Sequence, residues 1–253
     1  MKQRFITGII IILLALPPIL LGGIYLKALV VLFSAISVYE IVSIIDNKTP
    51  WYGYLALFMI VNILSLCSSE RFIIYLSLFI IALFASDVFS DNFDITRISY
   101  LYTMCLLFAT SVRGIYFISN QSTILLLYVA VVTYVCDTGA YLVGSSIGKH
   151  KLKPRISPNK TVEGSVGGWL IACLVSFGYG YFILHFEWSI LIVSSVLLPL
   201  GGQIGDLAFS SIKRHFNKKD FGTIFPGHGG ALDRIDSLLF NLLLFSVILQ
   251  WLS

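Results

Sequence analysis

Long apolar runs recur along the whole chain and constrain its fold more than any other feature. We place nine of them at about residues 5–21, 24–45, 51–68, 71–86, 98–113, 123–143, 165–185, 189–207 and 234–252. Runs of this kind cross a bilayer as helices, because a helix satisfies its own backbone hydrogen bonds. Only 12% of the residues are charged, against roughly 25% in a soluble domain. The sequence therefore predicts an all-α, polytopic helical membrane protein with about nine transmembrane helices.

Basic residues are distributed unevenly between the connections. If the N-terminus is cytoplasmic, 14 of the 17 Lys and Arg residues lie on the cytoplasmic side, which is the side that they favour. We therefore expect a multi-pass protein of the cell inner (plasma) membrane, with its N-terminus and the polar connections at 144–164 and 208–231 in the cytoplasm. The basic clusters in these connections also suit anionic lipid headgroups or a nucleotide polyphosphate.

Three of the four acids in the segment 205–236 stand at the ends of the apolar runs that flank it. They are Asp206, Asp233 and Asp236. Asp233 and Asp236 are three residues apart, so their carboxylates share one helix face. A helix cap explains Asp233 but not the other two. Carboxylates gathered at a membrane boundary repel one another unless a cation joins them, and oxygen-only ligands suit Mg²⁺. The sequence therefore predicts a Mg²⁺ site.

Basic side chains and bare backbone surround these acids. Ser210 follows Asp206 by four residues, on the same helix face. The PGHGG turn at 226–230 and the helix N-terminus after it can bring backbone N–H groups close to phosphate oxygens. Four basic residues can offset further phosphate charge: Lys213, Arg214, Lys218 and Lys219. Together these features predict a metal–polyphosphate site at the inner membrane surface, and we expect the active site to face the cytoplasm.

The sequence SPNKTVEG at 157–164 is the distinctive part of the first long connection. We expect Ser157 to cap a turn, and Lys160 and Thr161 to offer a charge and a hydroxyl to phosphate. Glu163 follows, and glycines at 164, 167 and 168 allow the next helix to pack closely.

Two acids lie inside apolar runs, Glu40 and Asp137. Ionisable residues in spans are costly, which makes them candidates for function. The alternatives are that each carboxylate reaches the interface or caps a neighbouring helix.

Three motifs together resemble the phosphatidate cytidylyltransferase (CDP-diacylglycerol synthase) family. The longest runs from S-I-K-R at 211–214 through K-D at 219–220 to P-G-H-G-G-A-L-D-R-I-D at 226–236. DTGAY at 137–141 and SPNKTVEG at 157–164 precede it in the order expected for that family. The resemblance is strong over about 130–240. In the N-terminal half it is limited to hydropathy and to the Tyr-Glu pair at 39–40.

The resemblance implies an enzyme of phospholipid synthesis that transfers the cytidylyl group of CTP to phosphatidic acid, giving CDP-diacylglycerol and pyrophosphate. It implies Mg²⁺ at Asp206 and Asp233, with Asp236 as a third ligand or directly behind them. A second, monovalent cation such as K⁺ and a homodimer are further expectations. No nucleic-acid partner is expected. We expect one integral membrane domain over 1–253, with an N-terminal helical part at about 1–120 and a catalytic part at about 123–253.

Each polar residue of the motifs then has an expected role. His228 would orient a phosphate or position its loop, with proton donation to pyrophosphate as the alternative. The residues expected to contact phosphates are Lys160, Lys213, Arg214 and Arg234. The other residues expected to line the substrate site are Asp137, Ser157, Thr161, Glu163, Ser210, Lys219, Gly229 and Gly230.

Two other functions stay open. A related lipid-phosphate enzyme, such as a polyprenol-type kinase or a cytidylyltransferase for another lipid phosphate, would use the same features. A transporter would use Glu40 and Asp137 as a proton or cation path. Against transport, the sequence has no inverted repeat, and its polar chemistry lies at the cytoplasmic rim and not at the midplane.

Overall fold

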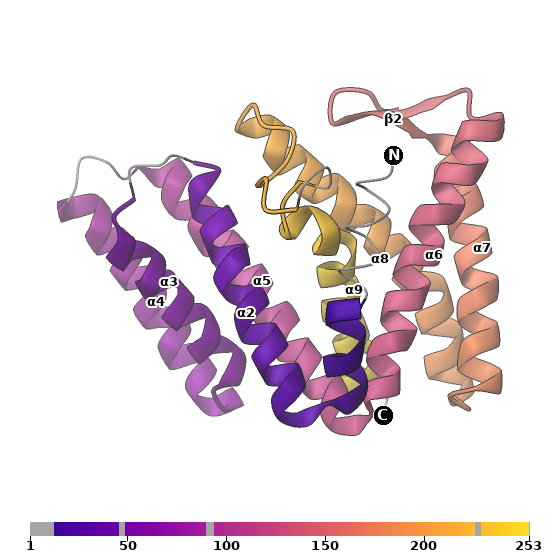
Figure 1. Ribbon diagram of the computed structural model, residues 1–253, viewed down its shortest axis with the longest axis horizontal. Helices are drawn as coiled ribbons and strands as arrows, with labels where there is room; N and C mark the ends of the chain where they lie inside the picture. Colours follow the sequence, from indigo (N-terminus) through magenta and orange to yellow (C-terminus); the bar gives the residue numbers. More distant parts are fainter. Residues whose placement is uncertain (1–12, 46–48, 90–93, 226–228, 253) are drawn as a thin grey trace. The chain divides into compact units, whose positions relative to one another are not determined.

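The computed structural model describes residues 13–45, 49–89, 94–225 and 229–252 (Figure 1). In these ranges the elements of regular structure are helices apart from one small hairpin and an isolated bridge between Phe225 and Gly229, which confirms the all-α fold. Residues 13–21 are helical and belong to the first expected span. The further helices are α2 (Gly23–Ser43), α3 (Trp51–Leu66), α4 (Ser69–Phe89), α5 (Ile95–Gln121), α6 (Thr123–Ile147), α7 (Val162–Phe182), α8 (Trp188–His215) and α9 (Leu232–Leu252).

Seven of the described helices, α2 and α4 to α9, are long and apolar enough to cross a membrane. The chain is therefore a multi-pass membrane protein. The spans expected at 71–86 and 98–113 are parts of longer helices, because α4 has 21 residues and α5 has 27. The shortest of the eight labelled helices is α3, with 16 residues.

The first long connection contains the hairpin, which the sequence did not predict. Strand β1 (Lys151–Lys153) pairs antiparallel with β2 (Ser157–Thr161). Ser157 is the first residue of β2 and pairs with Lys153 across the turn, and the capping role expected of its side chain stays a prediction. The turn lies just before it, where Ile156 N donates to Lys153 O at 3.1 Å. Pro154 occupies the second position of this turn, where its fixed φ is favoured.

The chain divides into two compact units, and each is described by itself. The first unit comprises Met1–Pro18, Gly23–Arg113 and Asp220–Asp233. Within it α3 packs against both α2 and α4 (Figure 1). The second unit comprises Ile19–Gly22, Gly114–Lys219 and Arg234–Ser253. It holds α6, α7, α8, the hairpin and most of α9.

Helices α6 and α7 of the second unit approach each other closely. A Cβ atom on Gly168 would lie 2.6 Å from Cys136 O and Ala140 N, and one on Gly164 would lie 2.6 Å from Ala140 O. Only residues without a side chain fit at such distances, which confirms the close packing expected for these glycines. The helix crossing is therefore set by backbone shape, as in other membrane helix pairs.

A buried hydroxyl cluster ties α8 to the same pair of helices. The Tyr128 hydroxyl of α6 lies 2.6 Å from Ser176 Oγ of α7 and 2.8 Å from Ser194 Oγ of α8. Hydrogen bonds of this kind join membrane helices because hydrocarbon offers polar groups no other partner. Three helices of the second unit are thus fixed at one point.

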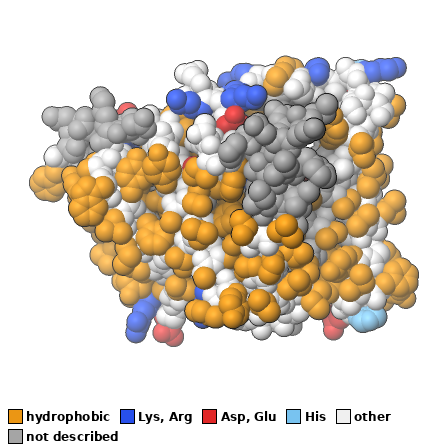
Figure 2. Space-filling view, viewed as in Figure 1, with side chains coloured by type: hydrophobic (Ala, Val, Ile, Leu, Met, Phe, Trp, Pro, Cys, Tyr) orange, Lys and Arg blue, Asp and Glu red, His pale blue; other side chains and the backbone are white. Residues whose placement is uncertain are grey.

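Hydrophobic side chains cover the sides of the helices in each unit (Figure 2). Leu174 and Phe182 of α7 are 76% and 72% exposed, for example. Lys and Arg side chains gather instead at the end of the second unit that carries the hairpin. Apolar sides with a charged end fit helices in contact with lipid.

Gly168→Ala should destabilise the protein, because the added methyl group would have to force α7 away from α6. We expect a loss of about 1–3 kcal/mol, the usual cost of overpacking, seen as a lower midpoint of thermal unfolding in detergent. Gly178→Ala is the matched control in the same helix, because nothing lies within 4 Å of its Cβ position. Equal midpoints for the two variants would contradict the packing argument.

Candidate active site

Three carboxylates of the second unit interact through their charges. They come from three helices: Asp137 from α6, Asp206 from α8 and Asp236 from α9. Asp206 repels both Asp137 and Asp236, and Asp137 also acts on Asp236. Because like charges in a poorly solvated place are unfavourable, this group needs cations nearby.

Lys160 supplies one of these cations. It stands on β2 of the hairpin, and its Nζ forms an ion pair with Asp206 Oδ2. Ser210 Oγ, one helical turn after Asp206, lies 3.4 Å from Asp206 Oδ1. Lys213 is 7% exposed and acts electrostatically on Asp236. With Asp137, the structure therefore brings together six of the residues that the sequence singled out.

The other basic residues of the motif lie around this group. Arg214 donates to Ile156 O at 3.3 Å and to Lys218 O at 2.8 Å, so its guanidinium ties the end of α8 to the hairpin turn. Lys219 and Arg234 are exposed. For Arg214 the described contacts are structural, and phosphate contact stays a prediction for all three.

Two residues of the hairpin motif hold the hairpin in place. Thr161 Oγ1 accepts from Gly164 N at 3.1 Å and so caps α7. Glu163 accepts from Lys149 N at 3.0 Å, and its Oε1 lies 2.5 Å from His150 Nδ1. These contacts fix the strand that carries Lys160. Contact of Ser157, Thr161 or Glu163 with a substrate stays a prediction.

The glycine-rich segment belongs to the first unit. Asp233 Oδ2 accepts from Phe221 N at 2.8 Å and from Gly230 N at 2.9 Å. Gly229 has a φ of 83°, in the region that favours glycine. Residues 226–228, and with them His228, lie outside the described residues. Asp233 therefore organises the chain on either side of the turn.

Glu40 is the residue whose place the sequence could not predict. Its charge inside an apolar run marked it as a candidate, but nothing local indicated its partners. In the structure it lies against Gly222 and Gly230 of the same unit. The sequence signals were the charge itself and the Tyr-Glu pair at 39–40, which is part of the family resemblance.

The carboxylate oxygens of this group are ligands of the kind that Mg²⁺ prefers. Among the residues that the structure describes, no group of three His, Cys, Asp or Glu side chains could hold a metal ion by itself. Asp137, Asp206 and Asp236 therefore interact through their charges but do not form a complete set of metal ligands. Mg²⁺ commonly binds through one or two carboxylates and takes its other ligands from water and phosphate. Asp206 and Asp236 fit that pattern.

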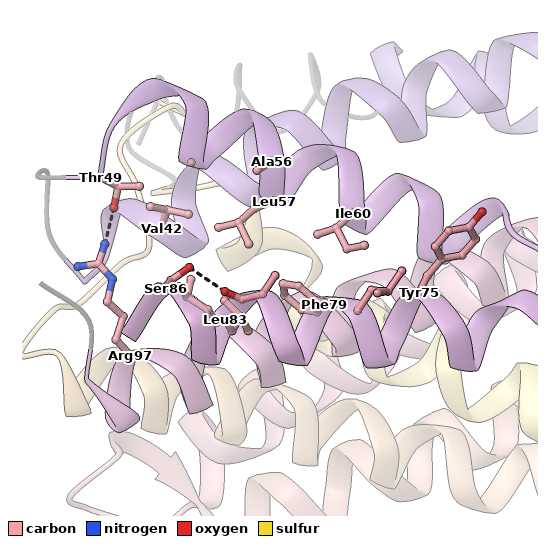
Figure 3. Close-up of a pocket in the computed structure, with 14 residues that line it drawn as sticks. Val42, Thr49, Ala56, Leu57, Ile60, Tyr75, Phe79, Leu83, Ser86 and Arg97 are labelled. Carbon is pink, nitrogen blue, oxygen red and sulfur yellow. Dashed lines mark hydrogen bonds between the residues drawn. The ribbon is translucent and has the colours of Figure 1, made fainter. Parts of the chain in front are cut away.

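A separate hollow of about 360 Å³ lies among α2 to α5 of the first unit (Figure 3). Arg97 and Thr49 stand at one end, joined by a hydrogen bond of 2.6 Å from Arg97 Nη2, and Tyr75 stands at the other. Its lining is otherwise largely apolar and contains no carboxylate. It therefore lacks the acids that a site for metal and polyphosphate needs.

The sequence model of the cytidylyltransferase family matches residues 2–252. The chain belongs to this family. The match covers nearly the whole chain, whereas the motifs alone pointed to 130–240. The N-terminal half, including Glu40, is therefore part of the family's architecture.

Several curated relatives share the full length of the chain. A phosphatidate cytidylyltransferase of Staphylococcus haemolyticus is 36% identical over 261 residues, covering 98% of this chain and 99% of its own. A protein of the same name from Staphylococcus epidermidis is 36% identical over 264 residues, and one from Staphylococcus aureus is 35% identical over 263, with the same coverage. The family that the motifs predicted is confirmed.

Replacing Lys160 should strengthen divalent-cation binding, because its ammonium group competes for the Asp206 carboxylate. We expect Lys160→Met to bind Mn²⁺, a paramagnetic substitute for Mg²⁺, about tenfold more tightly, or about 1.4 kcal/mol. Electron paramagnetic resonance of the purified protein without nucleotide would measure this affinity. Lys153→Met, an exposed lysine of the same hairpin, is the control. Unchanged or weaker Mn²⁺ binding in Lys160→Met would contradict the competition.

Proposed function

We propose that the chain is a phosphatidate cytidylyltransferase, which transfers the cytidylyl group of CTP to phosphatidic acid and releases pyrophosphate. The observation that carries this function is the family match over 2–252, together with relatives of that name similar over 98% of the chain. The group of carboxylates and lysines in the second unit supports it, because lysines bind phosphate oxygens and carboxylates can hold a metal ion that does so. The product is CDP-diacylglycerol.

The chemical obstacle is the meeting of two anions. An oxygen of the lipid phosphate attacks the α-phosphorus of CTP and forms a new P–O bond. The bond to the bridging oxygen breaks, and its electron pair leaves with pyrophosphate. A monoester phosphate has a second pKa of about 6, so it is already a competent nucleophile at neutral pH. The enzyme therefore needs charge stabilisation and alignment more than a strong base.

Lys160 and Lys213 are suited to that task. Lys160 carries its charge on a hairpin strand next to Asp206, and Lys213 stands two turns further along α8 from Asp206. When nucleotide binds, phosphate oxygens become stronger partners for these ammonium groups than a shared carboxylate. Arg214 and Arg234 would add charge at the edge, and Lys219 beyond them.

Mg²⁺ is the cofactor that we assign to this site. The family resemblance implies Asp206 and Asp233 as its ligands, with Asp236 as a third ligand or directly behind them. When bound, the ion shields the phosphates from each other and stabilises the leaving pyrophosphate. A monovalent cation such as K⁺ and a homodimer stay predictions.

The active site should face the cytoplasm, where CTP is made. The excess of Lys and Arg in alternate connections favours a cytoplasmic N-terminus. The hairpin and the end of α8 are joined by the Arg214–Ile156 contact, so they lie on one side of the membrane. We therefore place the protein in the cell inner membrane with this side inward.

The reaction can be tested with purified protein in detergent–lipid micelles, given phosphatidic acid, Mg²⁺ and CTP labelled at the α-phosphate. We expect label in the lipid fraction, and at least about 100-fold less with Asp206→Asn, because the Mg²⁺ that offsets the phosphate charges would lose a carboxylate ligand. Glu187→Gln is the matched control. It changes an exposed carboxylate at the opposite end of α8 that makes no cap hydrogen bond.

The outcomes separate the alternatives. Label that enters lipid from the γ-phosphate, and not from the α-phosphate, would identify a lipid kinase. Near-normal activity of Asp206→Asn at limiting Mg²⁺ would refute the metal assignment. No labelled lipid with any lipid phosphate, from folded protein, would turn attention to transport.

A further inference from the structure

Glu40 of α2 is a completely buried carboxylate, with 0% of its surface exposed. Its two oxygens each accept a backbone N–H, Oε1 from Ala231 and Oε2 from Leu232, both at 2.8 Å. A buried charge is tolerated only where such donors replace water. The partners are 191 and 192 residues away in sequence, so the contact joins distant parts of the first unit.

These two donors stand at the start of α9. A helix leaves the N–H groups of its first turn without partners inside the helix. Leu232 is the first residue of α9, and Ala231 precedes it. Glu40 thus caps α9 from another helix, and its negative charge is favoured there by the helix dipole.

The backbone is shaped to this carboxylate. A Cβ atom on Gly222 would lie 2.6 Å from Glu40 Oε1, and one on Gly230 would lie 2.5 Å from the same oxygen. Both glycines are therefore needed for contact with the side chain. A helix cap exposed at a surface would not require glycine at these positions.

A second carboxylate completes the arrangement. Asp233 Oδ2 accepts from Phe221 N and Gly230 N, so Glu40 and Asp233 together engage four backbone donors around the glycine-rich turn. The donors at Gly230, Ala231 and Leu232 are thus already bound to protein oxygens. In the structure these three N–H groups therefore have protein acceptors, and their contact with phosphate stays a prediction.

We propose that Glu40 is a positioning residue, which holds Gly230 and the start of α9 in the place that the reaction requires. The first turns of α9 carry Asp233, Arg234 and Asp236, so a shift of this helix end moves all three. The kinetic part of this inference rests on the proposed function. The structural part does not depend on which reaction is catalysed. A proton path through Glu40 is disfavoured, because both carboxylate oxygens are engaged by backbone donors.

Glu40→Gln tests the role at nearly constant size. The amide nitrogen must face either Ala231 N–H or Leu232 N–H, so one donor loses its acceptor. Hydrogen–deuterium exchange followed by mass spectrometry should then show faster exchange in peptides that contain 230–232, by at least about tenfold, as expected for a buried donor without a partner. Peptides of α7 and α8 should exchange as in the wild type.

Kinetics distinguish positioning from simple stabilisation. We expect kcat for cytidylyl transfer to fall at least about tenfold in Glu40→Gln, with KM for CTP within about threefold of wild type, because misplaced groups affect the reacting geometry most. Gly222→Ala should give the same pattern with Glu40 intact, since it pushes on the same carboxylate. Glu70→Gln, an exposed acid of α4 in the same unit, should change neither exchange nor kcat.

Three results would overturn the proposal. Wild-type exchange at 230–232 in Glu40→Gln is the first. The second is faster exchange through α7 and α8 as well, which would make Glu40 a residue of general stability. The third is normal kcat despite faster local exchange. If Glu40→Gln does not fold, Gly222→Ala and Glu40→Asp carry the same test. If the wild type transfers no cytidylyl group, the exchange result still decides the structural part.

Discussion

A carboxylate enclosed by apolar helices is stable only where donors or cations surround it, and this requirement organises both units of the molecule. In the first unit, Glu40 is satisfied by backbone N–H groups at the start of α9. In the second, Asp206 is satisfied by the ammonium group of Lys160. Each acid therefore ties a spanning helix to a polar segment that lies elsewhere in the sequence. The positions of those polar segments follow from where the acids stand in the helices.

The hairpin shows how a short connection can deliver one charge to a defined place. Thr161 caps α7 and Glu163 accepts from the backbone at 149–150, so both ends of the hairpin are anchored. Gly148 lies close to Thr161, because a Cβ there would be 2.6 Å from Thr161 Oγ1. Lys160 is next to this anchor, and its ammonium group reaches Asp206 of α8. Lys160 of this motif thus carries the positive charge, whereas Thr161 and Glu163 hold the hairpin in place.

The backbone donors at the end of the glycine-rich turn and at the start of α9 have protein partners. Glycine-rich loops before a helix commonly offer N–H groups to phosphate. Here the N–H groups of Gly230, Ala231 and Leu232 are bound by Glu40 and Asp233. These three donors therefore hold the start of α9 in place, and phosphate contact by the cationic side chains stays a prediction. The glycines at 222 and 230 leave room for the Glu40 carboxylate, because a Cβ atom on either would lie within 2.6 Å of Glu40 Oε1. Contact of Gly230 with a substrate stays a prediction.

The sequence by itself determined the helical membrane fold, the motifs and the family, because hydropathy and short-range spacing are local properties. Helix ends were less predictable: α5 extends to Gln121, well past the expected end of its apolar run at 113, since a helix can continue beyond the hydrocarbon region. The strand at 157–161 was missed because its pairing depends on a turn at Pro154. Only the tertiary structure decided which groups meet. Glu40 and Ala231 are 191 residues apart, and no local pattern encodes a hydrogen bond between a side chain and backbone at that separation.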